Sequence, residues 1–175
     1  MRRGPTNCGN QYFIDPPPEL LRIPPPFPHP DDLTGDLATI YVGPSRIGFE
    51  APINLLSRHS PFFANAFCHP FREASSHTID LPDDVAAAFA CVVRWMFEGQ
   101  TGLDATSTGL QICQVWILAD KLMMTALCNA TMTVFPARFR AVGGAISPST
   151  INYVFENTVP ERTHPLRRII VDVFA

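Results

Sequence analysis

The stretch LATIYV, Leu37–Val42, decides the fold of this chain. It is filled with β-branched and aromatic residues, the turn-forming segment GPSRIG follows at 43–48, and FEA resumes the extended pattern at 49–51. Two extended runs on either side of a Gly/Pro turn predict a β-hairpin. We therefore expect the folded part of the chain to begin near Asp36 with a small sheet.

Helical patterns occupy most of the chain beyond this hairpin. Ser60 is expected to cap a helix over 61–67, and HTIDL at 77–81 predicts a third strand. The strongest helix is predicted over 85–97, where apolar residues form a broad stripe that Asp83 or Asp84 caps and Gly99 ends. Further helices are expected over 110–120, 125–135, 150–157 and 166–174. Strands first and helices later predict an α+β fold, with a small, mostly antiparallel three-stranded sheet covered by a cluster of helices.

Proline divides the chain into a leader and a folded unit. Nine of the 18 prolines fall within the first 30 of 175 residues, and each removes a backbone donor and biases the preceding residue away from helix. We expect a disordered proline-rich leader over 1–35, in which Asp31 and Asp32 are linker charges. Such a leader is either a spacer or a ligand for an aromatic groove, with PPFP at 25–28 as its nearest match to a ligand.

Charge and hydropathy exclude several classes of partner. The chain has 13 Lys and Arg residues against 16 Asp and Glu and no basic run, which argues against a nucleic-acid-binding surface. The amino terminus lacks the apolar segment of a secretory signal, and the longest apolar run, 85–93, is about half of a membrane span. Five cysteines without a C-x-x-C motif indicate reduced thiols. We expect a protein of the cytoplasm or nucleus with no membrane partner.

The sequence carries no catalytic constellation. It has no G-x-G-x-x-G, no P-loop and no G-x-S-x-G. The best candidate for a hydrolase or zinc site is Cys68-His69 with His77 and His59, but it lacks the two close ligand pairs of a regular zinc site. Three other cysteines lie in apolar helical segments that disfavour the thiolate: Cys91, Cys113 and Cys128. We expect a binding module with no catalytic residue, metal, cofactor or small-molecule substrate.

Six segments occur in the order and spacing of a BTB/POZ domain: DLATIYVG at 36–43, Phe49 with LLSRHSPFF at 55–63, FRE at 71–73, IDLPD at 79–83, VRWMF at 93–97 and LADKL at 118–122. The chain therefore resembles BTB/POZ proteins from residue 36 to its end. The tail, at 149–157 and 166–174, resembles the helical extension of the filamentous-fungal BTB proteins. The resemblance implies a BTB/POZ domain over 36–136, followed by a linker and a C-terminal helical extension over 137–175.

The resemblance also implies a protein-interaction function. Part of the family consists of substrate adaptors that bind a cullin scaffold of a ubiquitin ligase, and a hydrophobic-x-Glu segment before the third strand takes part in that contact. Phe71-Arg72-Glu73 fits this pattern, with an apolar anchor beside a steering charge. The other interpretation of these residues is that Phe71 covers the core and Glu73 is solvated.

A self-association surface is less well matched. The resemblance implies a charged pocket that involves an acidic residue such as Asp36, but the family's usual His-Lys pair is replaced by Pro52 and Ile53. Dimerising members also place an exchanged strand and helix ahead of the hairpin, where this chain has its proline-rich leader. We therefore expect a monomer or a weak homodimer.

Two further hypotheses remain open beside the cullin adaptor. One is a self-associating scaffold or regulatory protein without cullin binding, and the other is the Cys/His metal or hydrolase site. The apolar pattern of 166–174 has no stop signal before Ala175, which indicates a truncated piece or an abruptly short product.

Overall fold

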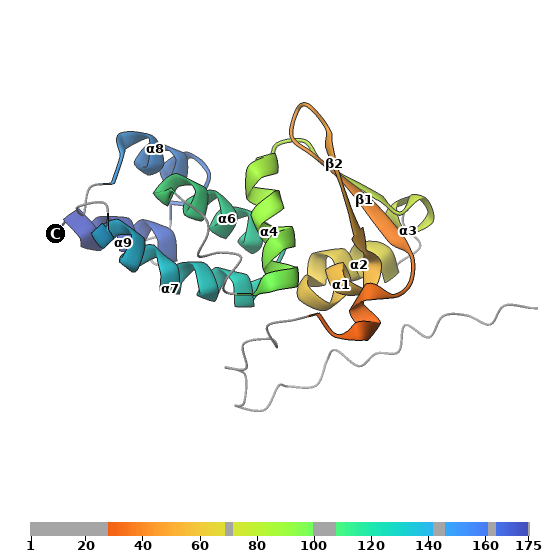
Figure 1. Ribbon diagram of the computed structural model, residues 1–175. Helices are drawn as coiled ribbons and strands as arrows, with labels where there is room; N and C mark the ends of the chain where they lie inside the picture. The colour runs from red at the N-terminus through yellow and green to blue at the C-terminus, as the bar shows by residue number, and fades with distance from the viewer. Residues whose placement is uncertain (1–27, 69–71, 100–107, 142–145, 161–163, 175) are drawn as a thin grey trace, which may run out of the picture.

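The hairpin predicted from LATIYV forms the centre of a small sheet. In a computed structural model, which describes residues 28–68, 72–99, 108–141, 146–160 and 164–174, β1 (Leu37–Val42) pairs antiparallel with β2 (Ile47–Pro52) (Figure 1). The turn between them requires glycine at Gly43, whose φ is +75° and whose Cβ would lie 3.2 Å from the carbonyl oxygen of Asp84.

The third strand makes the sheet mixed. β3 (Thr78–Leu81) pairs parallel with β1, on the side opposite β2, so the strand order is β2-β1-β3. The sequence favoured a mostly antiparallel sheet. β3 is parallel because the chain returns to it through a helical crossover made of α1 (Ile53–His59), α2 (Pro61–Cys68) and α3 (Arg72–Ser76) rather than a tight turn.

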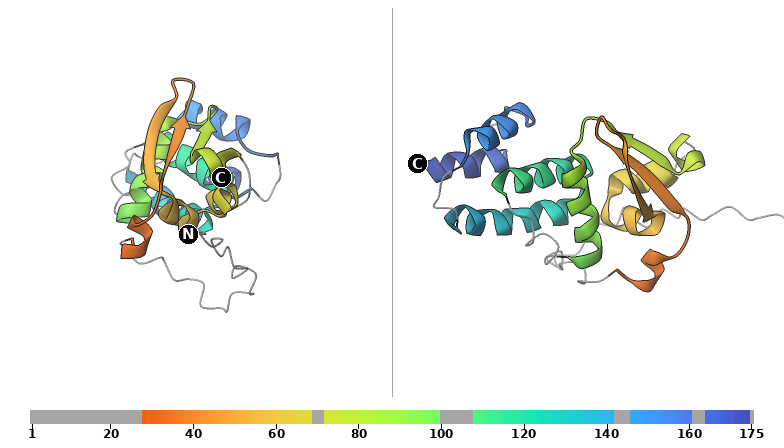
Figure 2. Two further views of the ribbon diagram at one scale, coloured as in Figure 1. Left: turned by 90° about the vertical axis from the view of Figure 1, so that its right-hand side faces the viewer. Right: turned by 45° about the horizontal axis from the view of Figure 1, so that its top comes forward.

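The remaining helices extend away from the sheet in successive layers (Figures 1 and 2). α4 (Ala86–Glu98) contacts β2 and α1 on one side and α6 (Gly109–Lys121) on the other. α6 pairs with α7 (Thr125–Ala141), and α8 (Pro148–Glu156) packs on α6 and on α9 (Pro165–Phe174). The predicted α+β class and its covering cluster of helices are confirmed. In the described part of the chain, no helix is long and apolar enough to cross a membrane.

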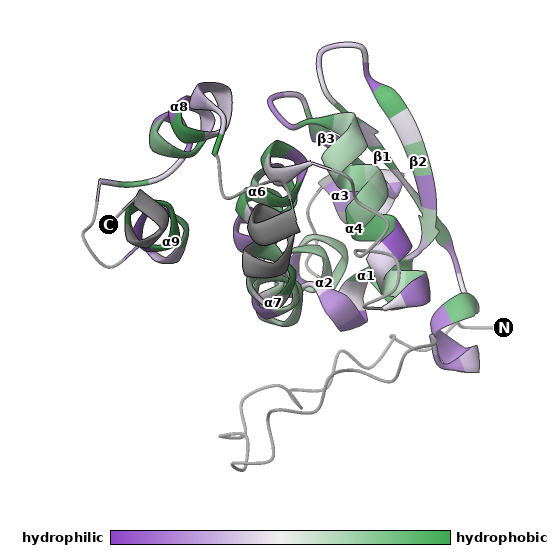
Figure 3. Ribbon diagram, turned by 60° about the vertical axis from the view of Figure 1, so that its left-hand side comes forward, coloured by the Kyte–Doolittle hydropathy of each residue, from purple (hydrophilic) through white to green (hydrophobic). Residues whose placement is uncertain are grey.

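A chain of aromatic rings joins the sheet to this cluster. Phe89 of α4 is fully buried, and its ring contacts Phe49 of β2 at 5.1 Å and Phe63 of α2 at 6.5 Å between centroids. Edge-to-face contacts of this kind add to the free energy gained from burying the rings. The outer helices α8 and α9 each carry both apolar and polar residues (Figure 3), and Leu166 and Ile170 of α9 are buried.

Ser60 lies between α1 and α2 and connects the two halves of the fold. Its side chain is completely buried, its hydroxyl donates to the carbonyl oxygen of Leu122 at 2.6 Å, and its oxygen accepts the backbone N–H of Phe63 at 3.3 Å. The predicted capping role is confirmed. The same hydroxyl also satisfies a carbonyl at the end of α6, 62 residues away.

Two pairs of aspartates behave differently from the prediction. Asp83 and Asp84 were expected to cap the helix that starts near 85, but the N-cap of α4 is Val85 and no side chain caps this helix. Because the helix starts beyond the two carboxylates, Asp84 is free to pair with Lys121 instead, at 2.6 Å.

The second pair, Asp31 and Asp32, was interpreted as charge in a leader. Residues 1–27 of that predicted leader lie outside the described residues. Pro30–Leu33, however, form a short 3-10 helix, η1, that packs on α1, and Asp32 is buried there. Its partner is Arg58, which is 26 residues away in sequence.

We expect Ser60→Ala to lower the free energy of unfolding by about 2 kcal/mol, because it leaves the Leu122 carbonyl and the Phe63 N–H unsatisfied in the core. Ser57→Ala is the matched control, since Ser57 lies on α1, one turn earlier, with no side-chain hydrogen bond in the described part of the chain, and its effect should be below about 0.5 kcal/mol. Urea unfolding of both variants measures the difference. Equal effects would contradict the connecting role of Ser60.

Candidate protein-binding groove

A groove of about 690 Å³ opens between α2, α3 and β3. We call it the α2–β3 groove. Its wall residues are Arg46, Phe62, Asn65, Ala66, Glu73, Ser76, Thr78, Ile79, Asp80 and Met123. These residues come from four separate parts of the sequence, which the crossover to β3 and the end of α6 bring to one surface. The size is in the range of sites that receive a protruding side chain or a small ligand.

The groove has an apolar part and a charged rim. Phe62 and Ala66 are half-buried on α2, and the Met123 side chain is 55% exposed. At the rim, Arg46 pairs with Asp80 at 2.8 Å, so these two charges compensate each other. Glu73 is half-buried and makes no ion pair with any described residue. The groove therefore combines apolar surface with a negative charge, Glu73, that no described side chain neutralises.

The structure places one of the three residues predicted for the cullin-type contact in this groove. Glu73 lies in the first turn of α3 and lines the wall. Arg72 begins the same helix, and Phe71 lies outside the described residues. The short helix α3 itself was not predicted, because five residues are too few to show an apolar period.

Met123 is a groove residue that sequence reasoning missed. It was expected only to lie between two helices. Its backbone is left-handed, with φ of 58°, so the flanking residues Leu122 and Met124 are buried while Met123 itself points outward. One signal in the sequence could have indicated this exposure. The left-handed residue that follows a helix is usually glycine, and no glycine follows α6.

The predicted self-association residues do come together, through the backbone. The N–H of Ile53 donates to the carbonyl oxygen of Asp36 at 3.0 Å, and the strand register sets Leu37 opposite Pro52. Asp36 is exposed, and Pro52 and Ile53 are half-buried. Among the described residues no Lys, Arg or His forms an ion pair with Asp36, so these three residues form a corner of the sheet without a charged pocket.

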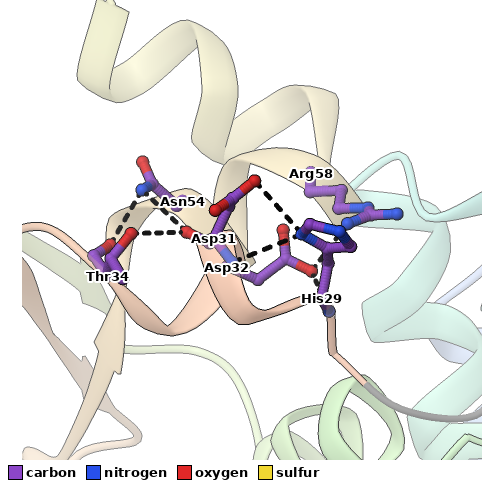
Figure 4. Close-up of polar contacts among 6 residues, drawn as sticks. All are labelled: His29, Asp31, Asp32, Thr34, Asn54 and Arg58. Carbon is purple, nitrogen blue, oxygen red and sulfur yellow. Dashed lines mark hydrogen bonds and ion pairs between the residues drawn. The ribbon is translucent and has the colours of Figure 1, made fainter.

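Beside this corner, residues 29–34 are fastened to α1, and we call them the N-terminal latch (Figure 4). The Asp32 carboxylate accepts the backbone N–H of His29 and the Arg58 guanidinium, both at 2.7 Å. The Asn54 amide donates to the carbonyl oxygens of Asp31 at 3.2 Å and Thr34 at 2.8 Å. Two side chains of α1 thus hold the latch.

The latch also determines the protonation of nearby groups. Burial alone would raise the pKa of the Asp32 carboxyl, but the hydrogen bonds from Arg58 and the His29 N–H, with the Arg58 charge, outweigh it and hold this pKa below its ordinary value. Burial, with the neighbouring Arg58 charge, lowers the pKa of His59, whose ring packs on Trp95 at 5.4 Å. The carboxylate is therefore charged and the imidazole neutral at pH 7.

Of the three cysteines predicted to be inert, Cys91 and Cys113 are buried and Cys128 is half-buried. Burial raises the pKa of Cys113 and, together with the Asp120 charge, that of Cys128 to about 12, and burial also raises the pKa of Cys91. Cys68 is exposed at the end of α2, and His69 lies outside the described residues. In the part of the chain that the structure describes, no three Cys, His, Asp or Glu side chains gather as metal ligands would.

A comparison with known protein families matches this chain to one family model. Residues 38–137 match the model of the BTB/POZ domain. The match includes every strand of the sheet, the crossover helices, α4 and α6. No curated protein sequence matches the chain.

Asp32→Ala should lower the free energy of unfolding by about 1–2 kcal/mol, because it removes the ion pair with Arg58 and the acceptor for the His29 N–H. Asp31→Ala is the control, since among the described residues its exposed carboxylate pairs only with the exposed His29 ring, and it should change stability by less than about 0.5 kcal/mol. Denaturant unfolding compares them. If Asp31→Ala were as destabilising as Asp32→Ala, the latch would not depend on the buried carboxylate.

The same pair gives a pH dependence. Because the folded pKa of Asp32 is lower than the unfolded value, its contribution is complete above about pH 4 and is lost as the pH falls through the folded pKa. The stability difference between the parent and Asp32→Ala should therefore stay constant from pH 7 to about pH 4 and shrink below it. A difference that instead grew on acidification would be inconsistent with this coupling.

Proposed function

This chain belongs to the BTB/POZ domain family, and from that premise we propose that it is a substrate adaptor that binds a cullin scaffold of a ubiquitin ligase through the α2–β3 groove. BTB domains are protein–protein interaction modules, so binding of protein partners follows from the family alone. The identity of the partner rests on the groove. The proposed role is binding, with no catalytic residue, cofactor or metal.

The single observation that carries the proposal is the position of Glu73. It is the glutamate of the hydrophobic-x-Glu segment, and it stands half-buried at the wall of the groove with no ion pair to any other described residue. A carboxylate in that position attracts a basic side chain during encounter and fixes the orientation of the partner. The apolar surface of Phe62 and Ala66 beside it gives the complex its buried area.

The two ends of the chain have separate roles in this proposal. We propose that residues 1–35 form a leader whose end, 29–34, is the N-terminal latch on α1, that 36–136 form the BTB/POZ domain, and that 137–175 form the linker and helical extension found in the filamentous-fungal members. The packing of α8 on α6 and of α9 on α8 supports an extension that is continuous with the domain. Three thiols among the described residues, Cys91, Cys113 and Cys128, form no disulfide, which supports a place in the reducing cytoplasm or nucleus.

The alternative function is a self-associating scaffold without cullin binding. We propose a monomer or weak homodimer instead, and the N-terminal latch supports this, because it covers part of α1 with the chain's own residues. The charged pocket expected for self-association also lacks a cationic partner for Asp36 among the described residues. Light scattering after size exclusion distinguishes a monomer from a stable dimer.

Glu73→Lys should weaken the binding of a purified cullin N-terminal domain by about hundredfold or more, because it places a cation where the partner's basic group would lie. The binding constant is measured by surface plasmon resonance with the full chain, testing immobilised cullin N-terminal domains one at a time. Unfolding in urea shows whether the variant is folded.

Glu50→Lys is the matched control for this charge reversal. Glu50 is exposed on β2 and does not line the groove, so the variant makes the same change of net charge at another site. It should bind as the parent does. Equal binding by Glu73→Lys and the parent, or no binding of any cullin domain by the parent, would refute the adaptor function.

A further inference from the structure

The turn after α6 is fixed from both sides. The backbone N–H of Leu122 donates to the carbonyl oxygen of Leu118 at 2.9 Å, and the N–H of Met124 donates to the carbonyl oxygen of Ala119 at 2.8 Å. The buried hydroxyl of Ser60 donates to the carbonyl of Leu122 at 2.6 Å. With Leu122 and Met124 both buried, the residue between them has little freedom to change its backbone conformation.

That residue is Met123, and its backbone is in the left-handed region with φ of 58°. A Cβ atom is disfavoured there because it lies too close to the following carbonyl oxygen, and glycine is the usual occupant after a helix. Strain of this kind at a non-glycine residue is a reason to look for a function. Met123 is more than half exposed, so core packing does not account for it.

The exposed side chain lines the α2–β3 groove, near the apolar surface of Phe62 and Ala66. The left-handed turn thus places an unbranched, polarisable side chain at the edge of a groove, where it can adapt to an apolar partner. Met123 also lies far in sequence from Glu73, so the two reach the groove from separate elements.

We propose that Met123 is an anchor residue of the groove, and that its left-handed backbone is kept because it holds this side chain against the bound partner. This inference rests on the proposed function. The occupant is the cullin N-terminal domain, whose contacting surface should present an apolar side chain to Met123 and a basic group to Glu73. Charge complementarity with Glu73, which no described side chain neutralises, favours this occupant over a second copy of the chain, whose groove would bring the same negative charge.

Met123→Gly distinguishes a role in binding from a role in stability. It removes the side chain that would contact the partner, and it also relieves the strain of the left-handed backbone. We expect the dissociation constant for the cullin N-terminal domain to rise at least tenfold, while the thermal unfolding midpoint stays the same or rises by a few degrees. Met123→Leu, which keeps an apolar side chain, should bind within about threefold of the parent.

His77→Gly is the matched control, since His77 is also left-handed, with φ of 49°, but is not a wall residue of the groove. It should relieve the same kind of strain and leave binding unchanged. If Met123→Gly bound as tightly as a parent that binds cullin, or if Met123→Leu lost binding equally, the anchor would be refuted and the adaptor function would stand. No cullin binding by the parent would instead refute the adaptor function itself.

Discussion

A buried hydrogen bond from Ser60 to the carbonyl oxygen of Leu122 is the contact on which the functional surface depends. The Ser60 hydroxyl oxygen accepts the Phe63 N–H and so caps α2, and its proton is donated to the carbonyl oxygen at the end of α6. The crossover that leads to β3 is thereby tied to the helical cluster. A buried hydroxyl has few alternatives to such a partner, because an unsatisfied polar group in the core is strongly destabilising. The same bond holds the start of α2 beside the turn at Met123, and residues of both elements line the α2–β3 groove.

The groove combines the two kinds of contact that protein interfaces use. Apolar surface from α2 and the α6–α7 turn supplies area that can be removed from water, and Glu73 supplies a charge that selects and orients the partner. Arg46 and Asp80 compensate each other at the rim and leave the Glu73 carboxylate as the distinguishing charge. The N-terminal latch lies on a different surface, on α1, and its residues do not line the groove.

Most of the fold was predictable from the sequence because its signals are local. The hairpin, the strand before Pro82 and the apolar stripe of α4 follow from residue type and spacing within each segment. The failures involve partners distant in the chain. From the sequence alone, Asp32 is indistinguishable from a linker charge, but in the fold it pairs with Arg58. Asp84 likewise has the sequence position of a helix cap, but in the fold it pairs with Lys121. At the groove, Glu73 was predicted through its segment, whereas the exposure of Met123 depends on a backbone conformation that no residue pattern specified.

Hydrogen–deuterium exchange of the full chain, with and without a bound cullin N-terminal domain, locates the surface that the partner covers. Binding at the groove should slow exchange in three separate segments that meet there: 62–66 of α2, 73–80 across α3 and β3, and the turn at 122–124. Exchange over the N-terminal latch and α1 should stay unchanged. Protection confined to the latch, or to α8 and α9, with none at these three segments, would show that the partner binds another surface and would refute the groove as the binding site.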